Sequence, residues 1–153
     1  MQPGKAVSSG LPTSPESVDG FDLEPGFTCK DYKGKKVIAL SSEDFVGKSI
    51  KEVLRLVNLK NKANGDMFKL ADSEYLAHVR ANHDDIHVDS RESNNTQRFN
   101  ILVFDDTEGE SRKFTRKKLL KSSSGDFDNI IEYTKPVGDE MFEEGDLVFL
   151  VQK

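Results

Sequence analysis

The stretch GDEMFEEGDLVFLVQK, from Gly138 to Lys153, contains the most hydrophobic run of the chain. Residues 147–151 are all apolar, and the turn from Glu143 to Asp146 introduces them. An unbroken apolar run of this length is typical of a strand that is covered on both faces. The sequence therefore predicts that this closing strand completes the hydrophobic core.

Length and composition restrict the class of protein. The 153 residues are enough for one domain with appendages, and the charged fraction of 32% predicts that part of the chain is not packed. A net charge of -5 argues against general attraction to nucleic acid. The single cysteine, Cys29, excludes an internal disulfide and favours a reducing compartment. No apolar run approaches the roughly 20 residues of a membrane helix, so we expect a cytoplasmic protein without membrane insertion.

The beginning of the chain resembles a linker. Residues 1–26 hold four of the five prolines among glycine and serine, which predicts a disordered tail. The domain is therefore expected to span residues 27–153. Two short β-prone runs, 27–32 and 35–40, surround the Lys33-Gly34 turn and favour a hairpin.

After residue 40, the spacing of the apolar residues changes to that of a helix. Apolar residues recur at helical spacing in Val46, Ile50, Val53, Leu54 and Val57. Ser49 and Glu52 form the S-x-x-E pattern that satisfies free amides at a helix start. These features predict a helix over residues 49–58.

The remaining segments complete an α+β domain. Strands are expected at 67–71, 99–104, 129–133 and in the closing run, and residues 75–79 are either a strand or a helical turn. A polar insertion is predicted near 80–98, and residues 112–121 are interpreted as a short helix with one buried edge. The predicted fold is one main helix packed on a sheet of about five strands.

Two acidic segments contain candidate ligands for a small ligand or ion. The first supplies the histidines and carboxylates that transition metals prefer, in His83, Asp84, Asp85 and His87. The β-branched residues between them indicate an extended segment, which favours a solvated polar loop over a metal site. The second follows the strand at 99–104 and begins with Asp105 and Asp106. Its oxygen ligands suit a divalent cation, although a solvated turn is again favoured because the spacing of an EF-hand is missing.

A basic stretch is the candidate contact for an acidic protein partner, and it includes Arg112, Lys113, Arg116 and Lys117. The alternative is a solvated face that pairs with the neighbouring acidic turn. Cys29 has no histidine nearby in the sequence, and the chain has no complete catalytic signature. We therefore expect a protein that is not an enzyme.

Two distant stretches resemble the TrkA-type C-terminal domain, the regulatory subdomain of potassium-conductance regulators and of some anion permeases. Residues 45–53 are similar to the turn of that family that opens a helix, and residues 144–151 are similar to its closing acidic-Gly-Asp turn and strand. The resemblance covers about 40 residues and requires insertions near 72–98 and 105–128. It implies a regulatory domain that senses a small ligand or ion, attached to or acting on an ion channel or transporter, and that forms a homodimer.

A second resemblance uses the same residues. A hairpin at 27–40, a helix at 49–58 and a terminal strand after an acidic-Gly-Asp turn are also the order of elements in ubiquitin-like β-grasp modules. That resemblance implies an interaction module that binds a protein partner through a sheet face or an exposed edge. The neighbours of the closing strand are the feature that would distinguish the two families.

Overall fold

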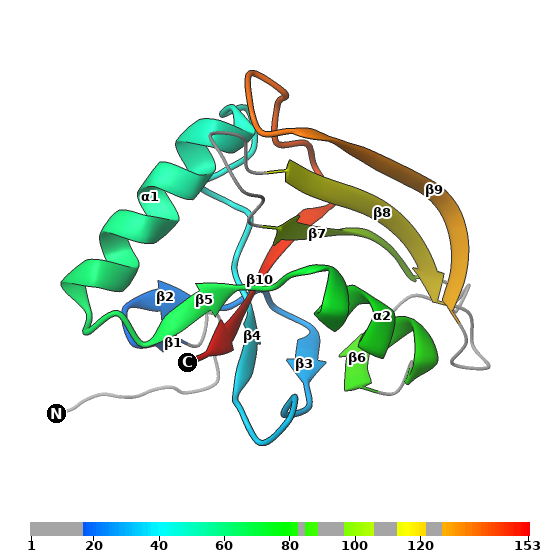
Figure 1. The fold of residues 1–153 in the computed structure, drawn as a ribbon, viewed down its shortest axis with the longest axis horizontal. Coiled ribbons are helices and arrows are strands. Elements are labelled where there is room, and N and C mark those ends of the chain that lie inside the picture. Colours follow the sequence, from blue (N-terminus) through cyan, green and yellow to red (C-terminus); the bar gives the residue numbers. More distant parts are fainter. Residues whose placement is uncertain (1–16, 83–84, 89–96, 106–112, 122–126) are drawn as a thin grey trace, which may run out of the picture.

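The computed structural model describes residues 17–82, 85–88, 97–105, 113–121 and 127–153. It confirms a small α+β fold, with helices packed on a mixed sheet (Figure 1). The helices are α1 (Ile50–Ala63) and α2 (Ser73–Ala81). The strands are β1 (Ser17–Val18), β2 (Phe21–Asp22), β3 (Phe27–Cys29), β4 (Val37–Ala39), β5 (Phe68–Leu70), β6 (Ile86–Val88), β7 (Gln97–Asp105), β8 (Lys113–Lys121), β9 (Phe127–Pro136) and β10 (Asp146–Gln152).

The closing strand β10 pairs with three other strands of the sheet. Five strands follow one another in the order β4, β10, β7, β8, β9, and β5 also pairs with β10. β10 runs antiparallel to β4 and β5 and parallel to β7. Six of its seven residues are buried, so the prediction that this run lies in the core is confirmed.

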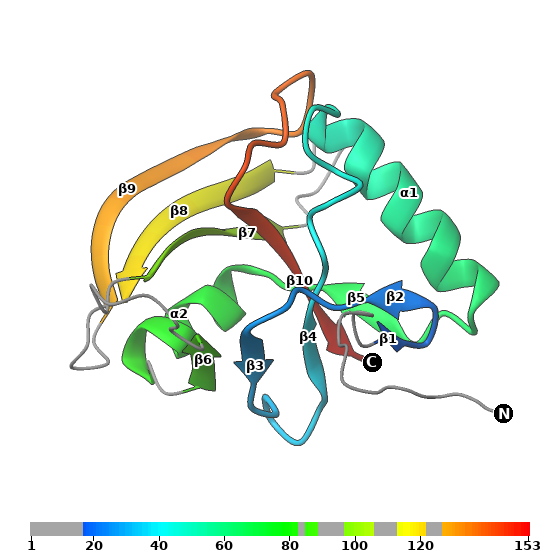
Figure 2. The same ribbon diagram turned by 180° about the vertical axis from the view of Figure 1, so that it is seen from behind.

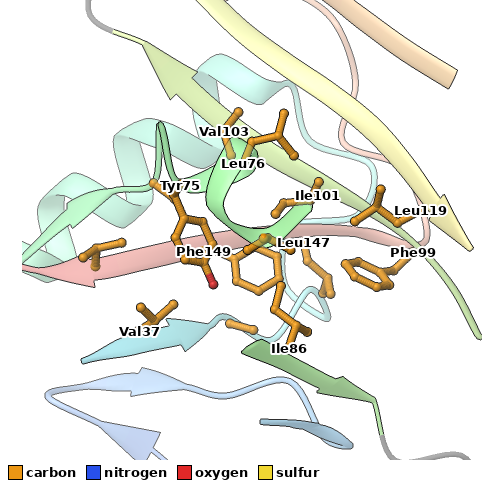
Figure 3. Packing of buried hydrophobic residues seen from close by; sticks show 14 residues of the cluster. Val37, Tyr75, Leu76, Ile86, Phe99, Ile101, Val103, Leu119, Leu147 and Phe149 are labelled. Carbon is orange, nitrogen blue, oxygen red and sulfur yellow. The ribbon is translucent and has the colours of Figure 1, made fainter. Parts of the chain in front are cut away.

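Around β10, both faces of the sheet are covered, so that this part of the domain has three layers (Figures 1 and 2). On one face, α1 packs its apolar side chains against Phe68, Leu102 and Leu150. On the other face, α2 and the β3–β6 pair cover a second cluster that includes Phe149 and Ile101. Figure 3 shows this second cluster, in which Tyr75 of α2 lies beside Phe149 with ring centroids 6.1 Å apart. Alternate residues of β10 thus supply both cores, as the period of a strand requires.

The start of α1 follows from the sequence as expected. The Ser49 side chain accepts a hydrogen bond from the amide of Glu52 at 3.1 Å, which satisfies one of the free donors of the first turn. The Glu52 carboxylate pairs with Arg55, whereas the capping-box pattern would direct it to the Ser49 amide. The helix extends to Ala63, five residues beyond the predicted end.

The prediction of a short helix at residues 112–121 is wrong. Residues 113–121 form strand β8, which pairs along nine residues with β7 and again with β9. Its charged residues hide any apolar alternation, so local pattern does not identify it as a strand. Hydrogen bonding to β7 on one edge and to β9 on the other determines the conformation of this segment, and its local propensity does not.

Other boundaries also differ from the sequence predictions. Residues 17–22 form a small β1–β2 hairpin and Phe21 is buried, so the domain begins before residue 27. The expected hairpin at 27–40 is reduced to one antiparallel bridge between Tyr32 and Lys35, around the predicted Lys33-Gly34 turn. The strands beyond this bridge separate, because β3 pairs with β6 while β4 pairs with β10. The open choice at 75–79 is settled as helix α2, with Asp72 as its N-cap.

A buried ion pair holds the beginning of β10. The side chain of Asp146 is completely buried and accepts hydrogen bonds from the Arg116 guanidinium at 3.1 and 2.7 Å. Asn100 of β7 and the amide of Glu143 also donate to this carboxylate. Arg116 in addition contacts Glu140 and the carbonyl of Met141. These bonds join β7, β8 and β10 to the 137–145 connection.

We predict that Asp146→Asn lowers the free energy of unfolding by about 3 kcal/mol, because the substitution breaks a buried ion pair. Urea unfolding followed by circular dichroism measures this change. The matched control is Asp139→Asn in the exposed part of the same connection, which is expected to change stability by less than about 0.5 kcal/mol. Equal losses in the two variants would contradict a special role for the Asp146 carboxylate.

Candidate functional site

Two grooves flank strand β5. The first, which we call the polar groove, has a volume of about 440 Å3 and lies between β5, the second half of α1 and the end of β7. The second, the lysine groove, has a volume of about 390 Å3 and lies between β5, the start of α2, the 32–35 turn and the end of β10. Lys69, Leu70, Asp72 and Lys153 line both grooves. β5 is therefore the ridge that separates them.

A side chain of α1 occupies part of the outer edge of β5. The side-chain amide of Asn61 donates to the carbonyl of Phe68 at 2.7 Å and accepts from its amide at 3.2 Å. It thus satisfies the two backbone groups that a neighbouring strand would otherwise bond. The polar groove lies beside this contact rather than along an open strand edge.

The carboxylates of the polar groove are engaged in structural contacts. Asp72 caps α2 by accepting from the amide of Tyr75 at 3.1 Å. Asp105 accepts from the amide of Ser73 at 2.9 Å and from its hydroxyl. Asp66 pairs with Lys153 at 2.9 Å. Asp105, a predicted ion ligand, thus lines a groove but stabilises the start of α2.

The lysine groove combines an apolar floor with a cationic rim. Leu70, Ala71 and Val151 form part of the floor, beside Tyr32. Its charged lining residues are Lys33, Lys35, Lys69, Lys153, Asp72 and Glu74. Lys33 pairs with Glu74, and the Lys153 ammonium group pairs with Asp66 of the polar groove. The excess of positive side chains makes this groove suitable for an anionic group.

Lys33 is held at the edge of that groove. Its ammonium group lies 5.1 Å from the centre of the Tyr32 ring and 3.5 Å from the Glu74 carboxylate. Tyr32 and then Glu74 raise the pKa of Lys33, so this side chain remains charged at neutral pH. Lys33 therefore contributes a positive charge to the edge of the lysine groove.

The sequence did not reveal the lysine groove. Its lysines come from three segments far apart in the chain, and no two of them stand in a pattern with a known chemical use. The Lys33-Gly34 turn was recognised only as a turn. Its position beside β5 and β10 depends on the tertiary fold.

The predicted metal segment is only partly described. Asp85 bonds the imidazole of His78, which ties the beginning of β6 to α2. The backbone of His87 pairs with Thr28 in the β3–β6 sheet. His83, Asp84 and Asp106 lie outside the described residues. Within the residues that the structure places, no three His, Cys, Asp or Glu side chains are arranged to hold a metal ion.

Two of the four basic residues that are predicted to contact a partner, Arg116 and Lys117, lie largely inside the domain. Arg116 binds Asp146 and Glu140, and Lys117 is only 3% exposed and has a bonding partner. Lys113 is exposed at the start of β8. Arg112 is outside the described part of the chain. A strand directs neighbouring side chains to opposite faces, so adjacent basic residues cannot form one surface row.

The first stretch that resembles the TrkA-type domain, 45–53, contacts the segment that comes just before the second one. The amide of Gly47 donates to the carbonyl of Phe142 at 3.1 Å, and the amide of Phe142 donates to the carbonyl of Lys48 at 2.8 Å. Ser49 and Met141 also form an isolated β-bridge. Residues that are more than 90 positions apart thus form one end of the domain.

Comparison of this chain with protein-family models, with curated proteins and with solved structures found no match. In the part of the chain that the structure describes, no helix has the length and apolar character needed to cross a membrane.

The single cysteine lies against the second core cluster rather than in a groove. Cys29 of β3 packs against that cluster, and burial raises its pKa to about 12. The nearby Tyr75 hydroxyl is buried without a hydrogen-bond partner among the described residues, and burial also raises its pKa. Both groups therefore remain protonated at neutral pH.

We predict that Cys29 reacts slowly with iodoacetamide in the folded protein. A thiolate is the reactive form, and at pH 8 a thiol with a pKa of about 12 holds far less of it than an unfolded cysteine with a pKa of about 8.5. The rate of alkylation, followed by mass spectrometry, is expected to rise at least about tenfold when urea unfolds the chain. Equal rates in the folded and unfolded protein would show that burial does not control this thiol.

Proposed function

We propose that this protein is a non-catalytic binding domain, and that the lysine groove is its ligand site. The ligand is a molecule that combines an anionic group with a flat apolar body. The anionic group pairs with ammonium groups of the rim, and the apolar body packs against Tyr32 and Leu70, which are the partly exposed aromatic and apolar side chains of the groove. This function follows from the chemistry of the groove rather than from the segments that were predicted as sites.

The observation that carries the proposal is the surplus of cations over an apolar floor. Asp72 is engaged as the cap of α2, and Glu74 is paired with Lys33. Lys69 projects from β5 between the two grooves, and the Lys35 ammonium group lies 3.3 Å from the backbone carbonyl of Lys153. An anion can therefore add to the rim without first displacing a carboxylate from these two lysines.

The regulatory role on a channel or transporter rests on the resemblance of residues 45–53 and 144–151 alone. Ligand binding in the lysine groove is compatible with such a role, because β10 contains most of the second stretch and its last residues line the groove. A ligand that contacts the end of β10 thus contacts the same strand on which Asp146 organises the opposite end.

A second candidate function, interaction with a protein, is favoured by a different observation. Val46 and Met141 are large apolar side chains that are 45% and 46% exposed, and the Ser49–Met141 bridge places their segments side by side. Exposed apolar residues that adjoin each other are a common feature of docking surfaces.

We predict that anilinonaphthalene sulfonate, a flat apolar anion, binds in the lysine groove. Fluorescence titration should show that the double variant Lys35→Ala/Lys69→Ala binds roughly tenfold more weakly, because it loses two cations that each contribute up to about 1 kcal/mol. Backbone amide shifts in NMR spectra should change around Leu70 and Val151.

The matched control is Lys51→Ala/Lys62→Ala, which removes two exposed lysines of α1 that line neither groove. This variant should bind the probe as the unmodified protein does. If both double variants lose affinity equally, or if the amide shifts lie elsewhere, the lysine groove is not the ligand site.

A further inference from the structure

The surface opposite the lysine groove has the complementary chemistry. Val46 and Met141 are exposed there, on segments 43–48 and 139–144, which backbone hydrogen bonds join and which also carry exposed carboxylates. The exposed acidic residues of these segments are Glu43, Asp44, Asp139, Glu143 and Glu144. We call this surface, which includes Val46 and Met141, the acidic end.

The acidic end and the lysine groove lie at opposite ends of β10. Gly145 precedes the first residue of that strand and Lys153 follows the last. A strand of seven residues spans roughly 23 Å. In Figure 1, the 137–143 connection is at the top of the molecule, and the turn between β3 and β4 is at the bottom. One protomer therefore presents a negative surface and a positive groove that point apart.

We propose that the lysine groove binds the acidic end of a second copy of this chain, so that protomers associate head to tail. This inference rests on the proposed function of the groove and names its partner. The charges of the two surfaces are opposite, and each surface also has apolar or aromatic side chains that are at least partly exposed: Tyr32 and Leu70 in the groove, Val46 and Met141 at the acidic end. Each carboxylate thus meets an ammonium group while these side chains cover each other.

The placement of the two surfaces determines the form of the assembly. A contact between two different surfaces of the same chain is heterologous, and each protomer then retains one free groove or one free acidic end. Such a contact builds an open chain unless its rotation closes a ring. Association should therefore continue beyond the dimer as the protein concentration rises.

The test uses two variants, each of which lacks one surface. Lys35→Ala/Lys69→Ala weakens the groove, and Glu43→Ala/Glu144→Ala weakens the acidic end. These four side chains are exposed, so both variants should keep the melting temperature of the unmodified protein. Sedimentation velocity up to about 1 mM should show growing assemblies of the unmodified protein, and each variant alone should associate at least about tenfold more weakly. Raising the salt from about 0.05 to about 0.5 M should also weaken assembly.

Mixing the two variants is the decisive measurement. Each still carries the surface that the other lacks, so the mixture should form a one-to-one dimer and stop there. A mixture that remains monomeric, or an unmodified protein that is monomeric throughout the concentration range, overturns the proposal. Assembly that neither variant weakens also overturns it.

The proposed function has a separate outcome. If anilinonaphthalene sulfonate binds the lysine groove but the unmodified protein never associates, the groove is a small-ligand site and only head-to-tail assembly is wrong. If mixing restores the dimer while the probe binds independently of Lys35 and Lys69, the protein contact is supported and the small-anion ligand is wrong.

Discussion

The buried carboxylate of Asp146 is the constraint on which the rest of the structure depends. A charge without contact to solvent must be paired and hydrogen-bonded, and here Arg116, Asn100 and the amide of Glu143 meet that requirement. These partners come from two other strands and from the connection before β10. The ion pair therefore sets where β10 begins, and Gly145 supplies the positive φ of 94° with which the chain enters the strand.

From that beginning, β10 organises both ends of the domain. Its first residues pair with β7, and its last residues pair with β4 and β5, so one strand passes from the acidic end to the lysine groove. The acidic end and the lysine groove are the places where the helices and turns that cover the sheet begin or end. At one end α1 is only beginning, and at the other the strand emerges beside the 32–35 turn and the start of α2.

The two ends of the domain differ in charge. Lysines outnumber carboxylates in the lysine groove, and carboxylates outnumber lysines at the acidic end. Four lysines line the lysine groove together with only two carboxylates, those of Asp72 and Glu74, whereas Asp105 lines the polar groove. At the acidic end, the exposed carboxylates outnumber Lys48, the one cation of segments 43–48 and 139–144. A chain with a modest overall charge of -5 thus presents two surfaces of opposite sign.

The sequence by itself determined the features that depend on neighbouring residues. The apolar run at 147–151 predicted a strand covered on both faces, and Ser49 predicted the start of α1, because burial pattern and helix capping are local. Only the tertiary structure decided that Lys113–Lys121 is a strand, since its hydrogen bonds are made to β7 and β9. It also decided that Arg116 is an internal ion partner and that lysines from three distant segments form one groove. Strand pairing and the meeting of charges act across space, so the spacing of residues along the chain does not encode them directly.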